Sequence, residues 1–274
     1  MKCKKILTAL LAAACTMSGC HGDLDIMQDN KLSASNMWID ESDAETATYG
    51  IYLYMRDALK SVHDIYLCWG EFRNGLWGAG TNKTLSGVDQ TQVRTSTMSS
   101  SNAYADWSVM YKTVNQANLI LKHVPEMGIS ESVRNFSLGN AYFSRAWCYF
   151  WIARIWGDAP LALTGYESTA GDLYLPRAPK AEIFARIESD LTEAERYVTD
   201  NSDKAVATPA AVQMLKADYA LWMYRVAGGG SSYLTMAEKA IEALNLSASR
   251  LESDYAQVFS SANKLNKEVI FAVH

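Results

Sequence analysis

The chain has 274 residues, with 25 Lys and Arg against 30 Asp and Glu, so its formal net charge is −5. No basic stripe that could neutralise phosphates is present, which argues against a nucleic-acid partner. The four histidines, at positions 21, 63, 123 and 274, show no metal-ligand spacing, so no metal site or cofactor is expected.

The N-terminus has the pattern of a bacterial lipoprotein signal. Lys2, Lys4 and Lys5 precede an apolar run over residues 6–14 that is too short to span a bilayer permanently. The run is followed by Met17-Ser18-Gly19-Cys20, which looks like a lipobox. We therefore expect residues 1–19 to be a cleaved signal peptide, Cys20 to be the lipidated residue and residues 21–25 to form a short tether to the membrane. Cleavage removes three lysines and no acid, which changes the net charge to −8.

Hydrophobic periodicity predicts helices over most of the remaining sequence. A first helix is expected from Ser42, whose spacing to Glu45 fits a capping box, to about Leu59. An irregular stretch follows to about residue 100, and a second helix is expected over 102–124. The next, over 130–156, is apolar nearly all round and should lie in the middle of the core. Gly157 suits its C-cap.

Three further helices are expected. One places apolar side chains on a single face between residues 180 and 198. Another begins after the N-cap Thr208 and ends before the glycines at 228–230, and its partner covers 232–244 with Ile241 turned inward. Together these last two match the length of a tetratricopeptide unit, although its strict consensus is absent. The β-prone run at residues 269–273 is expected to form a strand.

Two segments resemble the signature of the SusD/RagB family of outer-membrane nutrient-binding lipoproteins. They are Arg145-Ala146-Trp147-Cys148-Tyr149-Phe150, continuing to Gly157-Asp158-Ala159-Pro160, and Leu175-Pro176-Arg177-Ala178. The resemblance implies a mostly α fold, SusD-like and built on tetratricopeptide-like helix pairs with irregular loops. It also implies one helical domain over residues 20–274 that is the N-terminal part of a longer protein, with a C-terminal half missing. From the residues alone, the signature is interpreted as packing rather than as the binding site.

The resemblance also implies a function. The protein would be a lipid-anchored binder on the surface of a Bacteroidetes outer membrane that captures an oligosaccharide and delivers it to a SusC-like TonB-dependent transporter. Two alternatives stay open, namely peptide cargo, as in the RagB branch, and a helical-repeat adaptor that binds only protein. Catalytic motifs are absent from the sequence, so no catalytic residue is assigned and we do not expect an enzyme.

Candidate ligand-binding residues lie in and after the irregular stretch. Sugar sites combine aromatic planes with a few polar side chains, and the segment Trp69-Gly70-Glu71-Phe72-Arg73-Asn74-Gly75-Leu76-Trp77-Gly78 has that composition. Trp77, Arg73 and Asn74 are the first candidates, and Asn82 and Tyr104 come second. The alternative is that Trp69, Phe72 and Trp77 anchor the loop to the core, with Arg73 bonding backbone carbonyls. Cys68 and Cys148, in apolar sequence, are expected to be buried free thiols.

Overall fold

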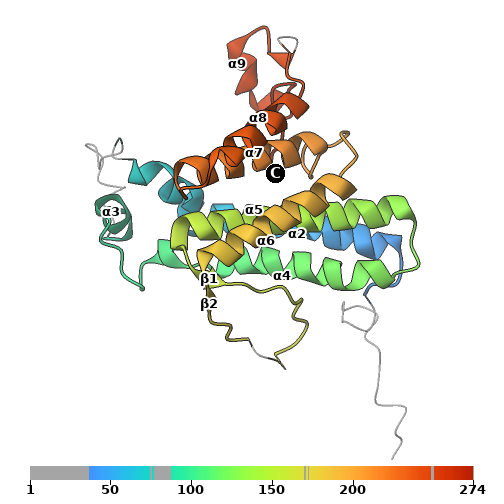
Figure 1. Cartoon of the computed structure of the whole chain (residues 1–274), viewed down its shortest axis with the longest axis horizontal. Helices are drawn as coiled ribbons and strands as arrows, with labels where there is room; N and C mark the ends of the chain where they lie inside the picture. Colours follow the sequence, from blue (N-terminus) through green and yellow to red (C-terminus); the bar gives the residue numbers. More distant parts are fainter. Residues whose placement is uncertain are drawn as a thin grey trace, which may run out of the picture. The chain divides into compact units, whose positions relative to one another are not determined.

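The computed structural model describes residues 37–74, 76, 88–169, 171, 173–247 and 250–273, without the side chains of residues 63 and 64. From Trp38 onward the chain forms one compact unit. The unit is mostly α-helical, as predicted, and its described residues include one short antiparallel strand pair (Figure 1). None of the described helices is long and apolar enough to cross a membrane. The elements are α2 (Glu41–Trp69), η1 (Glu71–Arg73), α3 (Val88–Thr95), η3 (Ala103–Ala105), α4 (Ser108–His123), η4 (Val124–Glu126), α5 (Glu131–Trp156), β1 (Ala159–Pro160), β2 (Arg177–Ala178), α6 (Lys180–Tyr197), α7 (Pro209–Arg225), α8 (Ser231–Ala243), α9 (Tyr255–Val258) and η6 (Ser261–Asn263).

Helix α2 begins and ends at residues that differ from the prediction. Its N-cap is Asp40, whose carboxylate accepts from the Asp43 amide at 3.1 Å, and the Asp43 carboxylate accepts from the Asp40 amide in return. The capping box therefore starts two residues before Ser42. The helix also continues ten residues past Leu59, because Ile65, Cys68 and Trp69 are buried in the core. The irregular stretch is correspondingly shorter, and α3 interrupts it.

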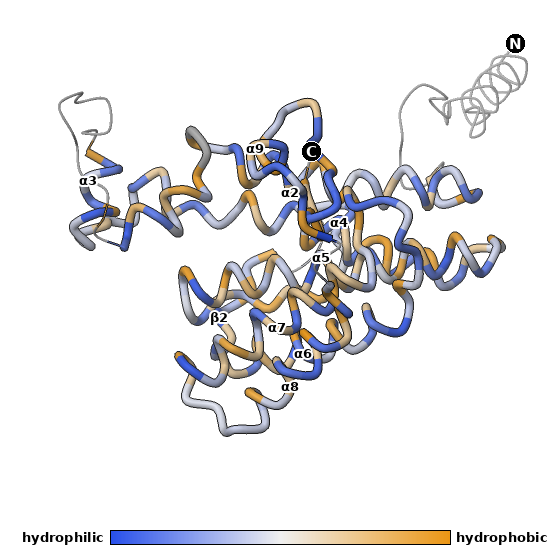
Figure 2. Tube along the Cα trace, turned by 90° about the horizontal axis from the view of Figure 1, so that it is seen from above, coloured by the Kyte–Doolittle hydropathy of each residue, from blue (hydrophilic) through white to orange (hydrophobic). Residues whose placement is uncertain are grey.

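Helix α5 lies in the middle of the core, as its apolar sequence predicts, and packs against α2, α4 and α6. Hydrophobic and hydrophilic stretches alternate along the surrounding helices (Figure 2). A close approach to the end of α6 depends on Gly139, where an added Cβ would lie 2.7 Å from Val198 Cγ2. At the other end Gly157 has φ of 72°, so glycine ends this helix as expected.

A buried polar cluster connects α4, α5 and α6. The Arg145 guanidinium donates to both carboxylate oxygens of Asp190, from Nε at 2.8 Å and from Nη2 at 2.7 Å. Its Nη1 donates to Asn118 Oδ1 at 2.7 Å. The side chains of Arg145 and Asp190 are 5% and 0% exposed, and Arg186 also approaches Asp190. These hydrogen bonds compensate the cost of burying the charges of Arg145 and Asp190.

Helices α6, α7 and α8 follow the predicted pattern with one error. Thr208 caps α7, accepting from the Ala211 amide at 3.1 Å, and α7 packs against α8 as the predicted pair. Ile241, expected to face inward, is 46% exposed. Ala240 is buried instead, on the same face as the buried Ala237 and Leu244.

The apolar run at residues 269–273 forms no strand, which corrects that prediction. Instead the Ala272 amide donates to the Lys204 carbonyl at 3.0 Å. The Phe271 ring packs between helices, with centroid distances of 5.3 Å to Phe143 and 6.1 Å to Tyr52. Cys68 and Cys148 are buried and free, as expected. Burial raises the pKa of both thiols, which keeps them protonated.

Candidate ligand-binding site

Two cavities meet at Trp107, and the first, which we call the arginine cavity, has a volume of about 450 Å³. It lies where the end of α2, η1, the segment after α3 and the end of α5 come together. Its walls contain four aromatic side chains, two arginines and three serines: Trp69, Tyr104, Trp107 and Trp156, Arg73 and Arg177, and Ser96, Ser99 and Ser100. Aromatic surface combined with polar groups is the composition expected of a sugar site.

Two of the tryptophans anchor the wall to the core. The indole N–H of Trp69 donates to the Tyr104 carbonyl at 2.9 Å, and that of Trp156 donates to the Ala105 carbonyl at 3.1 Å. Their rings meet edge to face at 5.3 Å. For Trp69 the anchoring alternative is therefore the better description, and Phe72 also packs against the core. These bonds fix η3 and thereby the position of Trp107.

Arg73 and Tyr104, two of the residues predicted from sequence, both line this cavity. Tyr104 is only 2% exposed, and its hydroxyl accepts from Gln90 Nε2 at 3.0 Å. Burial raises its pKa to about 12. Tyr104 is therefore part of the wall rather than an exposed plane. Arg73 is exposed, and no hydrogen bond or ion pair joins its side chain to another described residue.

The other predicted site residues lie elsewhere. Asn74 is exposed and does not line the cavity. Its amide group donates to Glu71 Oε2 at 3.0 Å and accepts from the Leu76 amide at 2.8 Å, so it shapes its own turn. Trp77, Asn82 and Cys20 lie outside the described residues.

Sequence reasoning missed Trp107 and Arg177 as site residues. The Arg177 guanidinium lies 4.5 Å from the centroid of the Trp107 ring, in cation–π contact. Its Nη1 donates to the Asp158 carbonyl at 2.6 Å. The strand pair β1–β2, with Pro160 opposite Arg177, brings it there. The sequence signal for Arg177 is its place in the family signature, although the residues of that signature taken alone favour packing.

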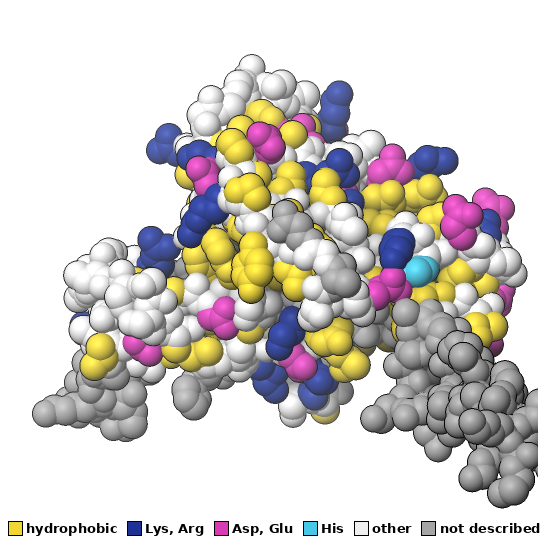
Figure 3. Space-filling view, turned by 90° about the horizontal axis from the view of Figure 1, so that it is seen from below, with side chains coloured by type: hydrophobic (Ala, Val, Ile, Leu, Met, Phe, Trp, Pro, Cys, Tyr) yellow, Lys and Arg dark blue, Asp and Glu magenta, His cyan; other side chains and the backbone are white. Residues whose placement is uncertain are grey.

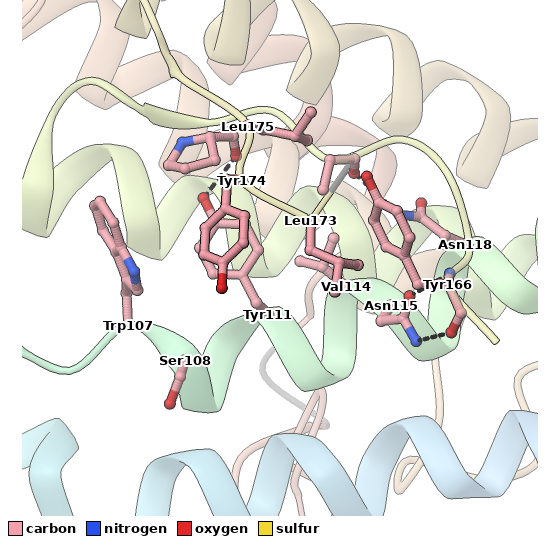
Figure 4. Close-up of a pocket in the computed structure, with 12 residues that line it drawn as sticks. Trp107, Ser108, Tyr111, Val114, Asn115, Asn118, Tyr166, Leu173, Tyr174 and Leu175 are labelled. Carbon is pink, nitrogen blue, oxygen red and sulfur yellow. Dashed lines mark hydrogen bonds between the residues drawn. The ribbon is translucent and has the colours of Figure 1, made fainter. Parts of the chain in front are cut away.

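The second cavity, which we call the tyrosine cavity, has a volume of about 480 Å³ and lies between α4 and the chain after β1 (Figure 4). Its lining includes Trp107, three tyrosines and several apolar side chains: Tyr111, Tyr166 and Tyr174, with Val114, Leu173 and Leu175. Tyr174 is 92% exposed. On the face seen in Figure 3, hydrophobic side chains gather toward the middle, among scattered charges.

Polar side chains that line the tyrosine cavity form hydrogen bonds with the backbone of the segment that covers it. Asn115 donates to the Tyr166 carbonyl at 3.0 Å and accepts from the Tyr166 amide at 2.7 Å, as Figure 4 shows. Asn118 donates to the Ala162 carbonyl at 3.0 Å. The Tyr111 hydroxyl donates to the Pro160 carbonyl at 2.6 Å, and burial raises its pKa. Few of these groups are left to orient a ligand.

Neither cavity has the composition of a metal centre. Among the described residues, no group of three or more His, Cys, Asp or Glu side chains could hold a metal ion. What the arrangement offers is aromatic contact, hydrogen-bond donors and positive charge.

Comparison with known sequences identifies the family. The SusD-like family described as "Starch-binding associating with outer membrane" matches residues 78–223, more than half of the chain. SusD-like protein P38 of Formosa agariphila is 26% identical over 190 residues, which are 69% of this chain and 36% of the relative. A SusD-like protein of Bacteroides ovatus is 26% identical over 174 residues, which are 61% and 32% of the two chains.

Solved structures agree with this assignment. B. fragilis NanU superposes with a TM-score of 0.72 and 27% identity, covering 90% of this chain and 50% of that one. A laminarin-binding SusD-like protein shares the fold, with a TM-score of 0.69 at 17% identity over 85% and 51% of the chains. The chain thus spans about half the length of these solved structures and about a third of the curated relatives. The signature, the sequence match and the fold together show that the chain belongs to the SusD-like family.

Proposed function

We propose that the protein binds a glycan in the arginine cavity at the outer-membrane surface and delivers it to a SusC-like TonB-dependent transporter. The observation that carries the binding step is the meeting of the half-buried Trp107 ring with arginine and serine side chains in one cavity of about 450 Å³. An indole plane covers the apolar face of a sugar ring, while guanidinium and hydroxyl groups bond its substituents. The family description, which names starch binding, supports glycan as the cargo.

The membrane location rests on the family and on the N-terminal pattern. The family description associates its members with the outer membrane. In this chain, the signal over residues 1–19 and the lipobox cysteine Cys20 supply a lipid anchor in the proposal. Stable anchoring needs more than one acyl chain, which a lipoprotein cysteine provides. Mass spectrometry of the mature N-terminus would test this, since an unmodified Cys20 or an intact signal would contradict it.

Binding without bond cleavage is part of the same proposal. Isothermal titration with neutral and charged oligosaccharides would measure affinity, and chromatography of the sugars after incubation would show whether any are cleaved. Trp107→Ala should weaken binding by up to about tenfold, because stacking contributes about 0.5–1.5 kcal/mol. The matched control is Tyr255→Ala, which removes an aromatic side chain that is 78% exposed and lies outside both cavities. Equal affinity of the Trp107 variant and the wild type would remove the arginine cavity from the proposal.

Peptide cargo and a protein-only adaptor role are the two alternatives. A peptide ligand would be bound in preference to every oligosaccharide, whereas an adaptor would bind neither. Co-purification from native outer membranes, with mass spectrometry of the associated proteins, tests the delivery step. Recovery of a TonB-dependent barrel at comparable abundance is expected, and recovery of the lipoprotein alone would contradict delivery.

A further inference from the structure

We propose that the arginine cavity selects glycans that carry an anionic substituent, a carboxylate or a sulfate, through Arg73 and Arg177. This inference rests on the proposed glycan-binding function and names the chemical class of its ligand. Among the described residues, the cavity lining contains two arginines and no Asp or Glu, although the chain as a whole has a net charge of −5. A concentration of positive charge in one cavity of an acidic protein points to an anionic ligand.

The two arginines lack acidic partners in the described part of the chain. None of the ion pairs between described residues involves Arg73 or Arg177. Each guanidinium retains N–H donors in the fork geometry that matches carboxylate and sulfate oxygens. Arg177 uses Nη1 to bond the Asp158 carbonyl and lies over Trp107, so its position is fixed before a ligand arrives.

Acidic side chains near the cavity are engaged with other groups. Asp106 accepts from the Ser108 amide at 2.8 Å and from its hydroxyl at 2.9 Å. Asp158 accepts from the Lys180 amide at 2.8 Å. Glu71 accepts from the Asn74 side chain. These carboxylates cap turns and helix starts, and none of them forms an ion pair with the arginines.

Hydroxyl groups line the same cavity. Ser96, Ser99 and Ser100 follow α3, and Ser96 has φ of 57°, in the left-handed region that glycine adopts without strain. A serine at this position places a hydroxyl in the cavity lining where a glycine would supply none. Serine hydroxyls donate to sulfate, carboxylate and sugar oxygens alike.

The tyrosine cavity offers a contrast within the same molecule. It shares Trp107, but no described Lys, Arg, Asp or Glu lines it, and its asparagines bond backbone groups. A neutral or apolar part of a ligand fits that side of Trp107. The anionic substituent belongs on the arginine side.

The test compares matched glycan pairs that differ only in charge. The probes are galacturonic acid oligomers with their fully methyl-esterified forms, and sulfated galactan oligomers with their desulfated forms, titrated into the full chain at low and high salt. We expect at least one anionic member to bind about tenfold or more tightly than its neutral counterpart, with salt reducing that preference. The pair that shows the preference distinguishes carboxylate from sulfate.

The variants are Arg73→Gln and the control Arg225→Gln, an exposed arginine on α7 outside both cavities. Arg73→Gln should lose about tenfold in affinity for the anionic member and leave the neutral one unchanged, while Arg225→Gln should match the wild type. Equal binding of both members overturns the anion preference, and an Arg73 variant with unchanged anion affinity overturns its assignment to the arginines; either result leaves glycan binding standing. Absence of binding to every oligosaccharide overturns both proposals, and so does a preference for an Asp/Glu-rich peptide.

Discussion

Replacing Asp190 by asparagine removes the charge that balances Arg145 inside the protein. The Asp190 carboxylate accepts hydrogen bonds from Arg145 Nε and Nη2 at 2.7–2.8 Å and one from Arg186 at 3.3 Å. Its side chain is 0% exposed. In the Asp190→Asn variant the amide nitrogen would face a guanidinium donor, and Arg145 would be left buried without a counter-charge. Arg145 also bonds Asn118, so the chain over the tyrosine cavity depends on this cluster.

The expected loss follows from burial. Breaking one partner of a buried ion pair costs about 3–5 kcal/mol. For a unit of this size, that loss lowers the melting temperature by roughly 6–20 °C. The double variant Arg145→Met/Asp190→Leu removes both charges together, so it should cost less than Asp190→Asn alone.

Urea denaturation followed by circular dichroism measures these free energies of unfolding. The control is Asp218→Asn, which breaks the Arg154–Asp218 pair, because Asp218 is 54% exposed and the expected loss is within about 1 kcal/mol. A loss below about 1 kcal/mol for Asp190→Asn, or a double variant that loses as much stability as Asp190→Asn, would refute the reasoning.

Three further predictions concern local contacts. Gly165→Ala should destabilise the fold by about 1–3 kcal/mol in urea titration, because the added Cβ would lie 2.9 Å from the α4 backbone, whereas Gly128→Ala meets nothing within 4 Å and should be neutral. Thr208→Ala removes the α7 cap and should cost about 1 kcal/mol in the same assay. The hydrogen bond from Lys122 lowers the pKa of Glu167, so its stabilisation is present above the unfolded pKa of about 4.3 and is lost as pH falls through the lower folded pKa. Between pH 5 and 3 the urea midpoint should therefore fall less steeply for Glu167→Gln than for the wild type.

Helices were predictable from sequence where their determinants are local. The apolar surround of α5 and the Thr208-Pro209 start of α7 depend on residues within a few positions of each other. The end of α2 was missed because its last turns are stabilised by tertiary burial of Ile65 and Trp69. The predicted strand at residues 269–273 failed for a related reason, since a strand needs a partner and Phe271 finds aromatic rings instead.

The candidate site was predictable only in part. Composition identified Arg73 and Tyr104, which line the arginine cavity. Composition could not predict the contact between Arg177 and Trp107. The two residues are 70 positions apart in the sequence, and tertiary contacts that no local pattern encodes bring them together. Composition also could not predict that the Tyr104 ring is buried in the cavity wall rather than exposed to a ligand. Burial depends on the elements that pack around a side chain.

The family signature contributes to packing and to the cavity at once. Gly157, with its positive φ, ends α5 and turns the chain into β1. Pairing of β1 with β2 sets Pro160 opposite Arg177, and the Asp158 carbonyl then accepts from the Arg177 guanidinium. These contacts fix Arg177 over Trp107, where both line the arginine cavity. A signature that reads as structural in sequence thus also determines the position of a cavity residue, because the turn that completes the core places the Arg177 charge beside the Trp107 ring.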